Sequence, residues 1–239
     1  MSPLFSKGDN TSDIVKESFN YYVMGSKHFH KNENEKALEL FEKAIALTPN
    51  RVTPYLAKAT VLANLKRYDK AIEIYNEALK LHKKQDTIYM DKAVTLVHAE
   101  RYKEALDTCD KGLEITQHPY LYNTKGGALS ALGKYEEAIE NYNKAIALDP
   151  SYFEPHENKF CPLNNLKRYQ EALETCDKAI ALEPNRHNIY KIHTNRAMAL
   201  NKLERYQEAL EAAEITLKTM PNYELAINAK KYAQSQLNN

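Results

Sequence analysis

One short stretch recurs six times along this chain at an almost constant distance. Its clearest copy is residues 134–150, KYEEAIENYNKAIALDP, and an alanine at the same place in each copy measures the period. These alanines are spaced by 34, 34, 33, 34 and 37 residues, and they are Ala37, Ala71, Ala105, Ala138, Ala172 and Ala209. A fixed period of this length is typical of a solenoid, in which stacked units pack on their neighbours. We therefore expect one elongated body that continues along the chain.

Each copy predicts an amphipathic helix that follows a second one. Counted from Ala138, apolar residues lie at offsets 0, 1, 4, 7 and 8, which fall on one face of a helix. Pro150 ends this helix, because the residue before a proline avoids helical dihedral angles. Another amphipathic segment, residues 119–131, precedes it and is joined to it by a short turn at 132–135. The repeating unit is therefore an antiparallel pair, helix A followed by helix B.

This order of residues resembles the tetratricopeptide repeat, whose period is 34 residues. In the fourth copy, the aromatic, small and proline positions of that pattern are held by Tyr122, Gly126, Ala138, Tyr142, Ala145 and Pro150. The resemblance implies an all-α, right-handed superhelical solenoid of antiparallel helix pairs. Small helix A residues such as Gly25 and Gly126 would let the two helices approach closely. Six repeats would occupy residues 13–223, namely 18–51, 52–85, 86–118, 119–152, 153–186 and 190–223.

The two ends of the chain differ from the repeats. Residues 1–12 have little periodicity and predict a flexible arm, with a helical pattern that begins at Ile14. Residues 224–239 predict a capping helix and a short tail, as repeat arrays commonly end in a helix with a polar outer face. In that helix the residues expected to face the array are Leu225, Ile227, Ala229 and Tyr232, with Lys230 and Lys231 outward.

Two irregularities interrupt the later repeats. Phe160 occupies a position that other copies fill with a small residue, and Pro162 lies inside the expected helix A of repeat 5. Proline there predicts a kink, which either opens a niche for a ligand or is a tolerated defect filled by Phe160. Three extra residues, 187–189, precede repeat 6, and they are about enough to add one helical turn.

Composition limits the classes of partner and compartment. Lys and Arg number 33 and Asp and Glu number 32, so no global basic field favours nucleic acid. The three cysteines form no closely spaced pair, and Cys109 and Cys176 share a packing position, which favours buried free thiols in a reducing compartment. We see neither a signal-peptide core near the N-terminus nor an apolar run that could span a bilayer. These observations predict a soluble cytoplasmic protein that binds neither nucleic acid nor membrane.

No chemical motif stands out from the repeats. The chain lacks phosphate-binding glycine loops, the HExxH zinc motif and the GxSxG nucleophile motif, and its eight histidines have no metal-ligand spacing. The acidic residues lie three or four positions from lysines on the same helices, as in surface ion pairs. We therefore expect a non-enzymatic protein without a metal or another cofactor.

The resemblance implies that the A helices line a concave groove that binds a partner. In the later repeats its positions carry carboxamides, which can donate to and accept from the main chain of an extended peptide. The residues expected to contact such a peptide are Asn123, Asn158, Asn165 and Asn195, with Lys191 and Lys202 at the far end. The alternative is that these asparagines only increase solubility in a chain rich in Asn and Lys.

In the first three repeats the same positions are mostly apolar. They include Tyr22, Phe29, Leu56, Met90 and Val94. An exposed apolar surface usually marks an interaction site. Its candidate occupants are an amphipathic partner helix, a second copy of this chain, or the N-terminal arm through Pro3, Leu4 and Phe5.

These features favour a non-catalytic adaptor or scaffold that binds an unidentified peptide or amphipathic helix. One alternative is a homo-oligomeric scaffold, and another is a regulatory domain detached from an enzyme. A third is a co-chaperone that holds a chaperone's C-terminal carboxylate, as some members of the family do. Of the five positions of that carboxylate clamp, Asn158 and Lys191 match, whereas Asn123, Gly127 and Asn195 do not. Without the cationic cluster, specific carboxylate capture is disfavoured.

Overall fold

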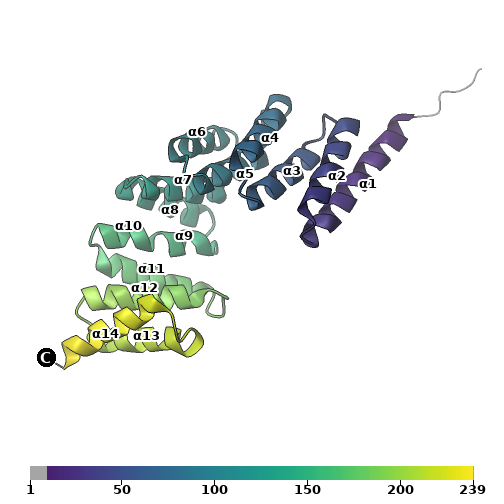
Figure 1. Cartoon of the computed structure of the whole chain (residues 1–239). Helices are drawn as coiled ribbons and strands as arrows, with labels where there is room; N and C mark the ends of the chain where they lie inside the picture. The colour runs from purple at the N-terminus through teal and green to yellow at the C-terminus, as the bar shows by residue number, and fades with distance from the viewer. Residues whose placement is uncertain (1–9, 239) are drawn as a thin grey trace, which may run out of the picture. The chain divides into compact units, whose positions relative to one another are not determined.

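The structure is a computed structural model, which describes residues 10–238. Within that range the chain forms fourteen α-helices and no strand, so the predicted all-α solenoid of helix pairs is confirmed (Figure 1). The chain divides into two compact units, with the boundary between Thr116 and Gln117. The expectation of one elongated body stays a prediction. The division coincides with the shortened third repeat, where α6 has 12 residues and the other B helices have 14.

Unit 1 contains three helix pairs. They are α1 (Asn10–His30) with α2 (Asn34–Leu47), α3 (Val52–Asn64) with α4 (Tyr68–Leu81), and α5 (Asp86–His98) with α6 (Tyr102–Leu113). The first helix begins at Asn10, earlier than the predicted start at Ile14. The proposed contacts of Pro3, Leu4 and Phe5 lie outside the described residues.

Unit 2 contains three pairs and a final helix. They are α7 (Pro119–Ala131) with α8 (Tyr135–Leu148), α9 (Phe153–Asn158) and α10 (Phe160–Asn165) with α11 (Tyr169–Leu182), α12 (Ile189–Lys202) with α13 (Tyr206–Thr219), and then α14 (Glu224–Leu237). Within residues 10–238, no helix combines the length and the apolar character needed to cross a bilayer.

The B helices bury the stripe that the period predicts. In α8 the side chains of Ala138, Ile139, Tyr142 and Ala145 are all buried. Gly126 on α7 faces the Tyr142 ring so closely that an added Cβ would lie 2.7 Å from it. Gly25 meets the ring of Phe41 at the same distance. These glycines therefore allow each helix pair to close on a central aromatic ring.

The turns between helix A and helix B share one backbone conformation. One residue in each adopts the left-handed region, and these residues are Asn32, Lys66, Glu100, Gly133, Lys167 and Glu204. In the second turn, the Arg67 N–H donates to the Leu62 carbonyl at 2.8 Å and the Lys66 N–H donates to the Ala63 carbonyl at 2.9 Å. Such bonds satisfy carbonyl groups that a helix end otherwise leaves free. Only one of the six left-handed residues is glycine.

The predicted kink in repeat 5 is present as a break between α9 and α10 at Lys159. Pro162 lacks the N–H that would continue the helical bonding. Phe160 is only 7% exposed and belongs to the core of unit 2 together with Ile139 and Leu163. The Phe160 ring therefore fills the space beside the break, and Phe160 also lines a cavity together with Asn158.

The insertion at 187–189 does not add a helical turn, so that prediction is wrong. His187 and Asn188 form a turn, and α12 begins only at Ile189. The Arg186 guanidinium donates from Nε to the Asn188 side-chain oxygen at 3.2 Å, and the Ile189 N–H donates to the Arg186 carbonyl at 2.9 Å. These bonds hold His187 and Asn188 in a tight turn, so that Ile189 alone of the three extra residues belongs to the helix.

The capping helix presents the predicted face only in part, since Ala229 is buried as expected but Leu225 and Tyr232 are not. Its buried residues are Ala226, Ala229 and Ala233, an alanine stripe that allows α14 to approach the array closely. Leu225 and Tyr232 were expected to face the array but are 50% and 48% exposed. The Lys230 ammonium, which was expected to point outward, instead bonds to the Glu214 carboxylate at 2.8 Å. The apolar side chains of α14 are therefore available on its surface.

Candidate functional site

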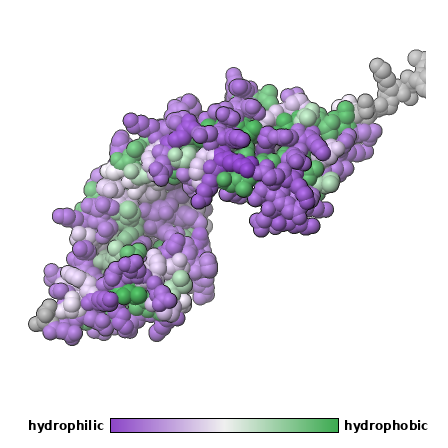
Figure 2. Space-filling model, viewed as in Figure 1, coloured by the Kyte–Doolittle hydropathy of each residue, from purple (hydrophilic) through white to green (hydrophobic). Residues whose placement is uncertain are grey.

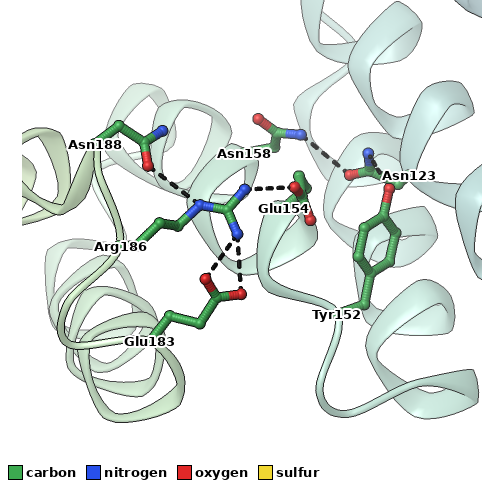
Figure 3. Close-up of polar contacts among 7 residues, drawn as sticks. All are labelled: Asn123, Tyr152, Glu154, Asn158, Glu183, Arg186 and Asn188. Carbon is green, nitrogen blue, oxygen red and sulfur yellow. Dashed lines mark hydrogen bonds and ion pairs between the residues drawn. The ribbon is translucent and has the colours of Figure 1, made fainter.

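Two of the predicted asparagines are joined by a hydrogen bond. The Asn158 Nδ2 on α9 donates to the Asn123 Oδ1 on α7 at 3.1 Å, and the Asn123 Nδ2 donates to the Tyr152 hydroxyl oxygen at 3.3 Å (Figure 3). Burial raises the pKa of Tyr152 to about 12, so its hydroxyl stays protonated at neutral pH. This chain of bonds fixes the orientation of both amides across neighbouring repeats.

Asn158 and Asn195 also line one cavity of about 600 Å³ in unit 2. Asn164, which was not among the predicted principal contacts, lines it as well. Within residues 10–238, the side chains of Asn164 and Asn195 have no hydrogen-bond partner. The cavity therefore presents amide groups whose bonding capacity is unused; we call this surface the amide groove.

The opposite side of the amide groove consists of small side chains on α7. Gly127, Ser130 and Ala131 line the same cavity. A Cβ added at Gly127 would meet only the Tyr142 hydroxyl, at 3.9 Å, which is an ordinary contact. Packing inside the helix pair therefore does not require Gly127 in the way that it requires Gly126, and the small residue keeps the groove open.

The other predicted polar residues lie apart from these amides. The Asn165 Nδ2 donates to the Cys161 carbonyl oxygen of its own helix at 2.9 Å, and Asn165 does not line the cavity. Lys191 is exposed and lies near Glu157. Burial raises the pKa of the Glu157 carboxyl, and the positive charge of Lys191 opposes this rise. Lys202 is exposed on α12 and lines a second cavity. The structure thus brings together Asn123, Asn158 and Asn195, but not Asn165.

The second cavity has a volume of about 230 Å³ and lies between α12 and α14, with α10 at its edge. Its lining residues are Asn164, Met198, Asn201, Lys202, Leu225, Asn228, Ala229 and Tyr232. The contribution of α14 was not predicted, because Leu225 and Tyr232 were expected on its buried face. The spacing of Ala226, Ala229 and Ala233 was the available signal for the correct face.

A second polar cluster fixes the other end of the α9 segment. Arg186 donates to Glu154 at 2.6 Å and to both oxygens of Glu183 at 2.9 and 3.0 Å (Figure 3). Its guanidinium carbon also lies 4.2 Å from the centre of the Phe153 ring. These contacts join α9 to the loop before α12, so they position the two helices that carry Asn158 and Asn195.

The apolar residues predicted in unit 1 have a different environment. Tyr22, Phe29 and Leu56 are half-buried and pack against the core of that unit. Met90 and Val94 are also half-buried. More fully exposed apolar side chains on α1 include Phe19, at 53%, and Figure 2 shows green apolar surface among the polar residues of this region. Their role as a binding surface stays a prediction.

The described residues also offer little for metal chemistry. Within residues 10–238, no three side chains of His, Cys, Asp or Glu gather in a way that could hold a metal ion. Cys109 and Cys176 are buried free thiols, as predicted, whereas Cys161 is exposed. Burial raises the pKa of the Cys176 thiol to about 12, so it is not a reactive thiolate.

Comparisons with families and known proteins agree with the architecture. A profile described as TPR repeat matches residues 126–159, one described as tetratricopeptide repeat matches 163–186, and one described as anaphase-promoting complex, cyclosome, subunit 3 matches 30–112. No curated protein matches the chain.

Several solved structures are similar to this chain. YrrB, described as a TPR protein with an unusual peptide-binding site, is 26% identical; the match covers 80% of this chain and 97% of YrrB, with a TM-score of 0.62. PilW, a type IV pilus biogenesis factor, is 17% identical over 88% of this chain and 97% of its own, with a TM-score of 0.78.

A chain of the anaphase-promoting complex hetero-tetramer Cut9–Hcn1 is 18% identical over 93% of this chain and 44% of its own, with a TM-score of 0.74. The last two likenesses concern the fold alone. The regular period, the observed helix pairs and the repeat profiles that match residues 126–159 and 163–186 lead to one conclusion: this chain belongs to the tetratricopeptide-repeat family.

Proposed function

We propose that the protein is a non-catalytic adaptor whose unit 2 binds an extended segment of a partner protein in the amide groove. The observation that carries this proposal is the cavity of about 600 Å³ that is lined by Asn158 and Asn164, on the broken A helix of repeat 5, and by Asn195 on the A helix of repeat 6. Buried free thiols at Cys109 and Cys176 support a role in a reducing compartment such as the cytoplasm.

The chemistry of the groove suits a peptide main chain. A carboxamide carries two donor hydrogens and an acceptor oxygen, so it can bond to both groups of a peptide unit whatever its side chain. Asn164 and Asn195 have this capacity unused among the described residues. An extended segment has free main-chain groups to offer, whereas a helical segment has already used most of its own.

Preorganisation strengthens the argument for Asn158. Its amide is held by Asn123, which is held in turn by Tyr152, so little side-chain freedom remains to be lost on binding. Restricting a side chain costs about 0.5–1.5 kcal/mol when it occurs on association. The carboxylate-clamp alternative is weaker. Of the two residues that match the clamp, Asn158 lines the groove, whereas Lys191 does not. The described peptide-binding role of YrrB supports the proposal by similarity.

The test begins with peptides selected on the wild-type protein from a displayed library of random sequences. Selected peptides are then titrated by calorimetry against the wild type and the double variant Asn158→Ala, Asn195→Ala. We expect at least about tenfold weaker binding, because each lost hydrogen bond is worth about 0.5–1.5 kcal/mol.

The matched control is Asn143→Ala, which removes an exposed asparagine of α8 that does not line the groove. It should bind like the wild type. Equal affinity of the double variant and the wild type would contradict the proposal, as would a failure to select any peptide.

A further inference from the structure

We infer that α14 is a specificity wall, and that the cavity beside it holds a large apolar side chain of the bound segment, next to an acidic residue. This inference rests on the proposed function of the amide groove. It assigns to α14 a role in recognition beyond that of a polar cap at the end of the array.

The arrangement of α14 separates two faces. The alanine stripe of Ala226, Ala229 and Ala233 is buried against the repeats. Leu225, Asn228 and Tyr232 are spaced by three and four residues, so they share the neighbouring face and line the cavity. The Tyr232 ring lies edge-on to Tyr206 with centroids 6.3 Å apart, which holds it in place at the cavity edge.

Size and chemistry select the kind of side chain. The cavity measures about 230 Å³ and is lined in part by Met198, Leu225 and Tyr232. An apolar protein cavity of about 150 Å³ is large enough to hold benzene. A leucine, methionine, phenylalanine or tyrosine side chain therefore fits, and methionine adapts its shape to irregular partners.

Position connects this cavity to the main-chain site. Asn164, Met198 and Leu225 line both the amide groove and the cavity beside α14. A segment held by the amides therefore passes the entrance of the apolar cavity and can place one side chain in it. The two cavities form one recognition surface. The amide groove accepts any peptide sequence, whereas the cavity beside α14 discriminates between side chains.

Charge determines what flanks the apolar residue. Lys202 lines the cavity, is exposed, and forms no ion pair with any residue in the described part of the chain. Its ammonium would attract a carboxylate on the bound segment and disfavour a cation. The chemical class of ligand is thus an extended peptide with a large apolar residue beside Asp or Glu.

Asn201 is the positioning residue of the wall. It is 6% exposed, and its Nδ2 donates to the Ala229 carbonyl oxygen at 2.9 Å, which joins α12 to α14. Its side-chain oxygen is buried without a donor among the described residues, so a hydrogen-bonding capacity remains beside the cavity. If the cavity opens slightly, an N–H of the bound segment would donate to this oxygen and offset the free-energy cost of the unpaired acceptor.

The experiment compares peptides selected from the same displayed random library by the wild type and by Leu225→Ala, Tyr232→Ala. We expect the wild type to enrich peptides with a large apolar residue beside an acidic one. Such peptides should bind the double variant about tenfold more weakly or worse, because burying one large apolar side chain is worth about 1.5–3 kcal/mol. Exchanging the apolar residue of the peptide for alanine should weaken binding to the wild type and change binding to the variant little.

Matched controls separate this site from the rest of the surface. Leu148→Ala removes an equally exposed leucine of unit 2 that lines neither cavity, and it should leave selection unchanged. Lys202→Glu should reverse the preference for acidic residues, whereas Lys231→Glu on the exposed side of α14 should not.

Each outcome of the selection has a distinct meaning. Peptides that depend on Asn158 and Asn195 but show no apolar preference, or keep it in Leu225→Ala, Tyr232→Ala, would overturn the inference and leave the proposed function intact. Selection of no peptide by the wild type would overturn both.

Discussion

Units 1 and 2 are built from the same helix pair but differ in how far their A helices depart from it. In unit 1, α3 and α5 are unbroken helices of 13 residues. In unit 2, the corresponding segment of repeat 5 is divided into α9 and α10, a loop is inserted before α12, and α14 adds a wall. The amide groove lies among these irregular elements. The comparison teaches that the B helices, which repeat one buried apolar stripe, maintain the stack, whereas variation in the A helices creates a candidate binding surface.

The tripeptide Pro-Asn-Arg, which occurs before α3 and before α12, shows the same contrast on a smaller scale. Arg51 follows Asn50 before α3, is exposed, and forms no ion pair within residues 10–238. Arg186 follows Asn185 before α12 and contacts Glu154, Glu183 and the Phe153 ring. Identical local sequence therefore has a structural role only where the neighbouring repeat supplies carboxylates and a ring.

The largest expected effect tests whether the two units depend equally on their central rings. Phe41→Ala in unit 1 and Tyr142→Ala in unit 2 each remove a ring that is no more than 2% exposed. Each should reduce the free energy of unfolding by about 3–5 kcal/mol, through lost burial and a residual cavity. Hydrogen exchange should show the loss of protection in α1 and α2 for the first variant and in α7 and α8 for the second. A loss below about 1 kcal/mol in either unit would contradict an equal structural role.

Two adjacent glycines provide the next test, because one serves the stack and the other the groove. Gly126→Ala places a Cβ 2.7 Å from the Tyr142 ring and should destabilise by about 1–3 kcal/mol. Gly127→Ala meets nothing closer than 3.9 Å and should stabilise by up to about 1 kcal/mol, because alanine favours helix. Chemical denaturation measures both. If the two substitutions changed stability in the same direction, the structural position and the groove position would not be separated as described.

A smaller effect is expected from the two arginines. Arg186→Ala should destabilise unit 2 by about 1–2 kcal/mol, a value reduced by the partial exposure of its carboxylate partners. Arg51→Ala, as the matched control, should change stability little. Thermal unfolding of both variants measures the difference, and a loss of similar size at Arg51 would refute the contrast between the two sites.

Acidification should affect unit 2 through a buried histidine. Burial lowers the pKa of His156, which is 6% exposed, and the nearby Lys159 and Lys178 lower it further. Below about pH 6.5 the unfolded chain binds a proton that the folded chain excludes, so stability falls as the pH decreases. Glu157, whose pKa burial raises, has the opposite effect at lower pH.

The measurement is the melting temperature of the wild type and of His156→Gln at about pH 7.5 and about pH 5.5, a range that spans the ordinary histidine pKa. The variant should lose less stability on acidification than the wild type. An identical loss in both proteins would exclude His156 as the source.

Much of the fold could be predicted because the B helices have a strict apolar period. The stripe at Ala138 and Tyr142 identified buried positions directly, and the proline at position 162 located the break in repeat 5. These predictions succeeded because they depend on residues within one helix pair. The division into two units was missed, since a one-residue change in spacing at the third repeat carries little signal in the sequence.

The candidate site could be predicted only in part. Register placed Asn123, Asn158 and Asn195 near one another, but it could not distinguish Asn165, which bonds to its own helix. The contribution of Leu225 and Tyr232 was missed because large apolar residues were expected to be buried before small ones. In α14 the close packing of alanines was favoured instead, a choice set by tertiary contacts.

The six left-handed turn residues between paired helices have a consequence for engineering. Five are not glycine, although the left-handed region costs roughly 1 kcal/mol or more for a residue with a Cβ. These turns, including the one at Lys167, lie outside the lining of both cavities in unit 2. Glycine at such positions could make a sturdier scaffold with its recognition surface unaltered, so that new groove sequences with destabilising side chains could be introduced and still be tolerated.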